Sequence, residues 1–143
     1  MSFTGNYSCN VFKTGLMNGT YNFTSGTFKI ALYTNAATLN ATTTAYTATG
    51  EASGGSYSAG GQTLTIAQSP TVGSSGGTTA YISFNNAAWT GSILARGALI
   101  YLYDGSTNPA VCVLDFGNDK TSSNTFTVQF PAVTNTSAII RIS

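Results

Sequence analysis

Apolar and polar residues alternate with a period of two along much of the chain, a pattern typical of half-buried β-strands. The alternation is clearest over 27–34, where Phe28, Ile30 and Leu32 share one face. It recurs in four further segments, 63–66, 81–84, 125–130 and 140–142. Most of these positions hold β-branched or aromatic residues, which fit a pleated surface. The pattern therefore predicts a chain built mainly of strands.

One segment, 98–103, is apolar on both faces, which indicates a central strand covered from both sides. A cluster of turn-forming residues follows at 104–109, and the apolar pattern resumes over 110–116, so these segments predict a β-hairpin. Turns are also expected at four places, Gly54–Gly55, Gly60–Gly61, Gly73–Gly77 and Asn118–Asn124. Short strands at this spacing favour an all-β fold, an antiparallel β-sandwich or a jelly-roll-like barrel.

The N-terminus differs from the rest, because Cys9, Phe12 and Leu16 follow a helical spacing. Ser8 is a candidate N-cap and Gly19 a candidate stop. We therefore expect one domain over 1–143, with a short helix or extended arm over 1–24 and the β-sandwich over 25–143. The Thr-, Ala- and Asn-rich stretch 34–48 is expected to be a long surface loop.

Charge is scarce: only 6% of the 143 residues are charged, with a net charge of +1, against about 25% in an ordinary soluble domain. Thr, Ser, Asn and Gly make up nearly half of the chain, so its surface is expected to be hydroxylated rather than ionic. Without a basic stripe no nucleic-acid partner is expected, and without a long apolar run no membrane partner is expected. The first residues show no signal peptide, so synthesis in a cytoplasm is expected.

The chain contains no histidine, which removes the commonest general base and metal ligand. We therefore expect no enzymatic activity, no cofactor and no bound metal. The Gly73–Gly77 segment matches a nucleophile-elbow pattern by its letters alone, since the histidine partner is missing. The acidic and amide residues from Asp104 to Asp115 fit a calcium loop poorly, because Pro109 stands where glycine is needed. Cys9 and Cys112 are expected to be buried thiols, a disulfide being the alternative.

Arg96 is unusual because it lies between apolar neighbours. It is interpreted either as an edge residue with its charge in solvent or as a contact to another subunit or partner, with Glu51, the only glutamate, as a possible mate.

Several strings resemble a family of small structural proteins of tailed bacteriophages, in order over about 80% of the chain. They are TFKIALYT at 27–34, TTAYTATGE at 43–51, SYSAGGQTL at 56–64, ARGALIYLYD at 95–104, AVCVLDFGNDKTS at 110–122 and AIIRI at 138–142. The resemblance implies a head decoration, or cement, protein that is β-rich, forms homotrimers and binds the major capsid protein on the outer surface of the virion. It implies no catalytic residues.

The residues are compatible with this role, because strand edges with few charges invite pairing with another chain. The segment favoured for the capsid or inter-subunit contact is 2–16, with Phe3, Tyr7, Phe12 and Leu16 outside the strand pattern, and the edge around Arg96 is the second choice. The alternative function is a receptor- or carbohydrate-binding module of a phage tail or fibre.

Overall fold

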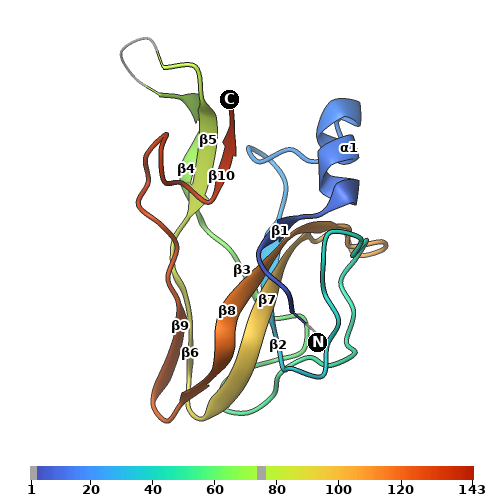
Figure 1. Cartoon of the computed structure of the whole chain (residues 1–143), viewed down its shortest axis with the longest axis vertical. Coiled ribbons are helices and arrows are strands. Elements are labelled where there is room, and N and C mark those ends of the chain that lie inside the picture. The colour runs from blue at the N-terminus through green and yellow to red at the C-terminus, as the bar shows by residue number, and fades with distance from the viewer. Residues whose placement is uncertain (1–2, 74–76) are drawn as a thin grey trace.

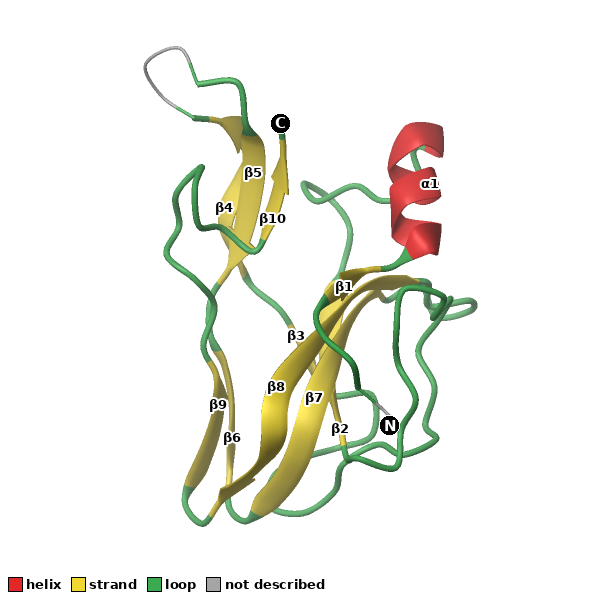
Figure 2. Ribbon diagram, viewed as in Figure 1, coloured by secondary structure: helices red, strands yellow, loops and turns green. Residues whose placement is uncertain are grey.

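A computed structural model describes residues 3–73 and 77–143 and confirms an all-β, sandwich-like chain with one short N-terminal helix (Figures 1 and 2). About 43% of the residues lie in strands and 7% in helix. The elements in chain order are β1 (Tyr7–Ser8), α1 (Asn10–Asn18), β2 (Phe28–Tyr33), β3 (Gln62–Thr63), β4 (Ile66–Val72), β5 (Ala80–Phe84), β6 (Ala87–Thr90), β7 (Ile93–Leu102), β8 (Ala110–Ser122), β9 (Thr125–Val128) and β10 (Ile140–Ile142).

The main layer is a five-stranded antiparallel sheet in the order β1-β8-β7-β2-β3. Its centre is the predicted hairpin of β7 and β8, in which Leu99 lies opposite Val113. β2 pairs along the other side of β7, with Phe28 opposite Leu102. Both faces of the apolar half of β7 are buried, as the two-sided pattern predicted.

The second layer begins with the two-stranded ribbon of β6 and β9. Short connections at 91–92 and 123–124 join β6 to β7 and β8 to β9, so both strands of this ribbon continue into the main sheet at the same end (Figure 1, bottom). Four apolar side chains of the ribbon are buried, whereas the residues between them are exposed. The buried ones are Ala87, Trp89, Phe126 and Val128. The ribbon thus turns one face toward the core.

A third sheet, in the order β10-β5-β4, projects beyond the two layers (Figure 2). Phe84, at the base of β5, is buried and packs near Phe28 and Phe130, with ring centroids 6.3 and 5.8 Å away. Farther out the strands are poorly covered: Val72 and Ile142 are each 55% exposed. The predicted turn at Gly73–Gly77 lies here, and its residues 74–76 are outside the described residues.

The helix α1 has the expected apolar spacing, but its N-cap differs from the predicted one. Cys9, not Ser8, is the N-cap, and it makes no side-chain capping bond. Ser8 instead belongs to β1 and lies opposite Cys112, so sheet pairing determines its position. Gly19 ends the helix as predicted, in the left-handed conformation with φ 80°. In the described residues no helix is long and apolar enough to cross a membrane.

The turn predicted over Asn118–Asn124 is wrong, because β8 continues to Ser122. A wide bulge makes this possible: Gly97 lies opposite Asp115 and Ala95 opposite Lys120, so four residues of β8 face Arg96 alone. Gly117 takes a positive φ of 86° within this bulge, a conformation that glycine adopts without a steric cost. Pairing with β7 outweighs the weak strand propensity of these residues.

Candidate functional site

The N-terminal segment lies across the hairpin of β7 and β8, where the sequence placed its candidate contact residues. β1 adds two residues to the outer edge of β8, with Tyr7 opposite Val113. Phe3 lies over β7 at Gly97 and is 1% exposed. A Cβ atom at residue 97 would overlap the Phe3 ring. The missing side chain of Gly97 therefore provides the space that Phe3 occupies.

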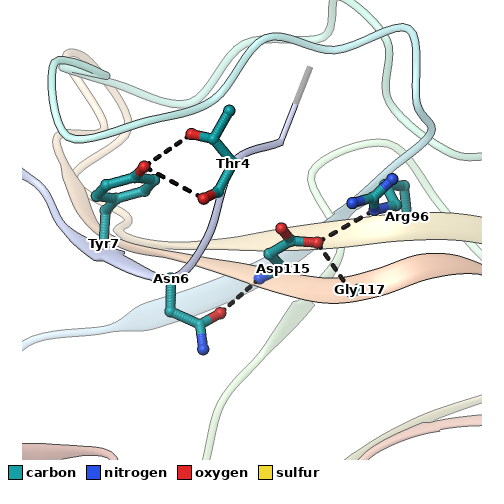
Figure 3. Close-up of polar contacts among 6 residues, drawn as sticks. All are labelled: Thr4, Asn6, Tyr7, Arg96, Asp115 and Gly117. Atoms are coloured by element: carbon teal, nitrogen blue, oxygen red, sulfur yellow. Dashed lines mark hydrogen bonds and ion pairs between the residues drawn. The ribbon is translucent and has the colours of Figure 1, made fainter. Parts of the chain in front are cut away.

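Polar contacts fix the same segment to β8 (Figure 3). The backbone N–H of Asp115 donates to the Asn6 side-chain oxygen at 2.7 Å. The Asp115 carboxylate accepts from Arg96 Nε at 3.1 Å and from the Gly117 N–H at 2.9 Å. Tyr7 and Thr4 join their hydroxyl groups at 2.7 Å within the segment. The segment is thus held by packing, strand pairing and side-chain bonds together.

The pair of Arg96 and Asp115 is the only ion pair among the described residues, and each side chain is about a tenth exposed. Removal from water alone would raise the pKa of Asp115, but the Gly117 N–H and the Arg96 guanidinium outweigh that effect and lower it. Glu51 lies elsewhere and bonds to tyrosines, so the suggested pairing of Arg96 with Glu51 is wrong.

Two of the four apolar contact candidates are core residues in this structure. Phe3 and Phe12 are 1% and 3% exposed, so neither side chain is available to a partner. Tyr7 and Leu16 are partly buried against the same core. The picture of a free arm over 2–16 is therefore corrected: its described part, 3–16, completes the core because it carries the apolar groups that cover β7 and β8.

A cleft of about 500 Å³ separates α1 from β10. Phe12 and Leu16 form its helical wall, and the C-terminal segment 139–143 forms the opposite wall. These two candidates therefore lie side by side, away from Phe3 and Arg96.

A larger groove of about 560 Å³ runs between β8 and β9. Its apolar lining includes Phe116, Phe126 and Phe130, and the rings of Phe116 and Phe126 are 6.1 Å apart. Asn6 and Asp115 lie at its border, so the groove adjoins the polar contacts of Figure 3.

A half-buried hydrogen-bond cluster around Glu51 helps to hold the long loop between β2 and β3. The Glu51 carboxylate accepts hydrogen bonds from Tyr46 Oη at 2.7 Å, Tyr57 Oη at 2.6 Å and the Gly60 N–H at 2.7 Å. Tyr101 Oη donates to the Gly60 carbonyl at 2.7 Å. Burial, followed by the bond to Glu51, raises the pKa of Tyr46 to about 12. Each of these polar groups has a partner, which is typical of a structural network.

The Asp104 turn explains the residues that resemble a calcium loop. The carboxylate accepts from the N–H groups of Asn108 and Ser106 and from the Thr107 hydroxyl, at 2.9, 2.8 and 2.7 Å. These bonds, that of Asn108 first, lower the pKa of Asp104 to about 2. Hydrogen bonds within the turn thus engage both oxygens of the Asp104 carboxylate. No group of three or more potential metal ligands occurs in the described parts of the chain.

Cys9 and Cys112 are both buried free thiols, as expected. Burial raises the pKa of Cys9 to about 11 and that of Cys112 to about 12, so both remain protonated at neutral pH. Neither thiol has the reactive form that nucleophilic catalysis requires.

The pairing of Arg96 with Asp115 has no clear signal in the sequence, because a register shift between Ile100 and Tyr101 displaces the partners expected from the turn. The position of Glu51 does have such a signal. The only glutamate, Glu51, lies between Tyr46 and Tyr57 in a loop, a spacing that allows both hydroxyl groups to reach it.

Comparison of the chain with protein-family models, curated proteins and solved structures gave no match.

Proposed function

We propose that the chain is a structural protein of a bacteriophage virion, of the head decoration type, which binds the outer surface of the major capsid protein shell and stabilises it. The observation that carries the proposal is the projecting sheet β10-β5-β4, whose outer strands β4 and β10 each have one edge that no strand pairs with in the described ranges 3–73 and 77–143. Such edges pair readily with other chains.

The scarcity of charge on the projecting sheet favours association with another chain. Its three strands contain one charged residue, Arg141, whereas exposed strand edges are usually protected by several charged residues. Pro70 removes one backbone donor from β4, and Arg141 lies in β10, so each outer strand has a single protecting residue. A surface of this kind suits a protein that functions while it is bound to another protein.

A homotrimer would match the three-fold positions that a capsid surface repeats. Once one subunit is bound, each further contact becomes intramolecular, so modest contacts sum to tight attachment. Few ion pairs are needed for this, in keeping with the composition of the chain.

Imaging of purified particles that carry labelled protein tests the proposal. Hundreds of copies spread over the head are expected. A few dozen copies confined to the tail would instead favour the receptor- or carbohydrate-binding alternative. Absence of the label from particles would overturn both.

A further inference from the structure

The groove between β8 and β9 is an open seam of the sandwich. β9 pairs with β6 on one side only, and no strand pairs with its other edge in the part of the chain that the structure describes. The whole run 125–131 lines the groove, so the free edge of β9 forms one wall from end to end. The opposite wall is β8, whose outer edge β1 covers at two residues only.

Apolar core residues also line the seam. Phe126 and Val128 alternate with the exposed Thr125 and Thr127 along β9, and Phe116 faces the same space from β8. A strand added beside β9 would continue this alternation. Its inward side chains would lie next to Phe126 and Val128, and its outward side chains next to the two threonines.

Strand addition has a physical reason at this place. The ribbon of β6 and β9 has only two strands, and a two-stranded sheet is marginally stable by itself. A third strand would satisfy the free backbone groups of β9 and cover the aromatic lining of the groove.

Charge determines what kind of strand fits. Two ionisable residues, Asp115 and Lys120, line the groove, and Arg96 already neutralises Asp115. Lys120 has no ion-pair partner among the described residues, and its neighbour Asp119 does not line the groove. The net charge that the groove presents is therefore positive, at the end near the β8–β9 connection.

We propose that this groove binds an extended segment of a partner protein, which pairs with the free edge of β9, has apolar residues at alternate positions and places a carboxylate near Lys120. The inference depends on the groove alone, and it holds whether or not the protein decorates a phage head.

Two labelled eight-residue peptides of alternating valine and threonine test the proposal, one with a glutamate at each end and the other with a lysine at each end. Fluorescence polarisation at low salt should show that the glutamate peptide binds about threefold more tightly, the scale of one exposed ion pair. Lys120→Glu should reverse the preference. Lys13→Glu, on the exposed part of α1, is the matched control and should leave it unchanged.

Hydrogen exchange distinguishes strand addition from contact through side chains alone. The bound peptide should slow exchange of the backbone N–H groups within 125–130. A peptide with the same side chains and alternate N-methylated amides should bind much more weakly, because it lacks the backbone donors. Phe116→Ala, checked by circular dichroism for a native fold, should also weaken binding.

Three results would overturn the proposal. One is no protection within 125–130 with either peptide, and another is an unchanged preference in Lys120→Glu. The third is concentration-dependent protection of 125–130 in the protein alone, which would show that a second copy of the chain occupies the groove.

Discussion

At the scale of single residues, Glu51 connects several parts of the long loop between β2 and β3. Its carboxylate accepts three hydrogen bonds from this loop, in addition to backbone bonds such as that from the Ala52 N–H to the Leu32 carbonyl. The same network reaches β2, because Tyr57 Oη also accepts from the Leu32 N–H at 2.9 Å. One acidic side chain thus connects a long loop to a central strand.

Glu51→Ala should lower the free energy of unfolding by about 3 kcal/mol, because it leaves two tyrosine hydroxyl groups and one backbone N–H without their acceptor. Urea denaturation followed by circular dichroism measures the change. Asp119→Ala, at an exposed position of β8, is the control and should stay within about 0.5 kcal/mol of the parent protein. Equal effects of the two substitutions would contradict this role of Glu51.

The tyrosines predict a loss of stability in alkali. Burial raises the pKa of Tyr21 and of Tyr46 to about 12, and it raises the pKa of Tyr33, Tyr57 and Tyr101 further. The unfolded chain therefore loses these protons first, starting near pH 10, and the free energy of unfolding should fall from there toward pH 12. Denaturation curves recorded at pH 8, 10 and 11 test this, and a constant midpoint would rule it out.

Single residues were the least predictable level of the molecule. Their partners depend on strand register, which a bulge can shift: Asp115 lies opposite Gly97, next to Arg96, between two register shifts of the β7–β8 hairpin. The burial of Phe3 was equally hidden, since it requires a glycine on a strand 94 positions further along the chain. No periodic pattern within the N-terminal segment indicates that contact.

At the scale of elements, the N-terminal segment and β7 depend on each other through Gly97. A methyl group there would overlap the Phe3 ring and lie 2.5 Å from the Leu114 carbonyl oxygen. The element that the sequence left as a possible arm is therefore attached by a steric match.

Gly97→Ala should destabilise the protein by about 2 kcal/mol through overpacking and should speed hydrogen exchange in residues 3–8. Phe3→Ala should cost about 3 kcal/mol by itself. The double variant should lose less stability than the sum of the two single losses, because the overlap with the ring disappears and only the close contact with the Leu114 carbonyl remains. Strictly additive losses would show that Phe3 and Gly97 are not coupled.

Elements with strong local signals were predicted well. The hairpin of β7 and β8 follows from a two-sided apolar run and a cluster of turn residues, and α1 follows from its spacing and from Gly19. The far half of β8 was missed because its Asn, Asp and Gly residues favour turns locally, whereas pairing with β7 determines their conformation. The segregation of the strands into separate sheets has no local signal at all.

At the scale of the whole molecule, the N-terminal segment 3–16 belongs to the same core as the sheets. Phe3, Cys9 and Phe12 are each 3% exposed or less. Deletion of residues 2–16 should therefore remove more stability than a domain of this size possesses, and circular dichroism should show an unfolded chain. A native β spectrum for the truncated protein would contradict this and restore the free-arm picture.

Attachment to phage heads, under the proposed function, should resist salt. Only 6% of the residues are charged, so hydrophobic and backbone contacts must provide most of the affinity. At 1 M salt the screening length is about 3 Å, which weakens ion pairs between exposed groups. Occupancy of expanded heads, measured by gel densitometry after washing at low and high salt, should therefore be equal. Detachment at high salt would indicate an electrostatic interface instead.

The position of β2 beside β7 has a kinetic consequence. The hairpin of β7 and β8 closes over a short turn, an event that takes roughly microseconds. β2 must then find β7 across more than sixty intervening residues, with Tyr33 opposite Gly97 and Phe28 opposite Leu102. Proteins dominated by such distant pairings fold in roughly milliseconds to seconds. During that interval the apolar edge of β7 is unprotected, so newly made chains at high concentration compete between folding and aggregation.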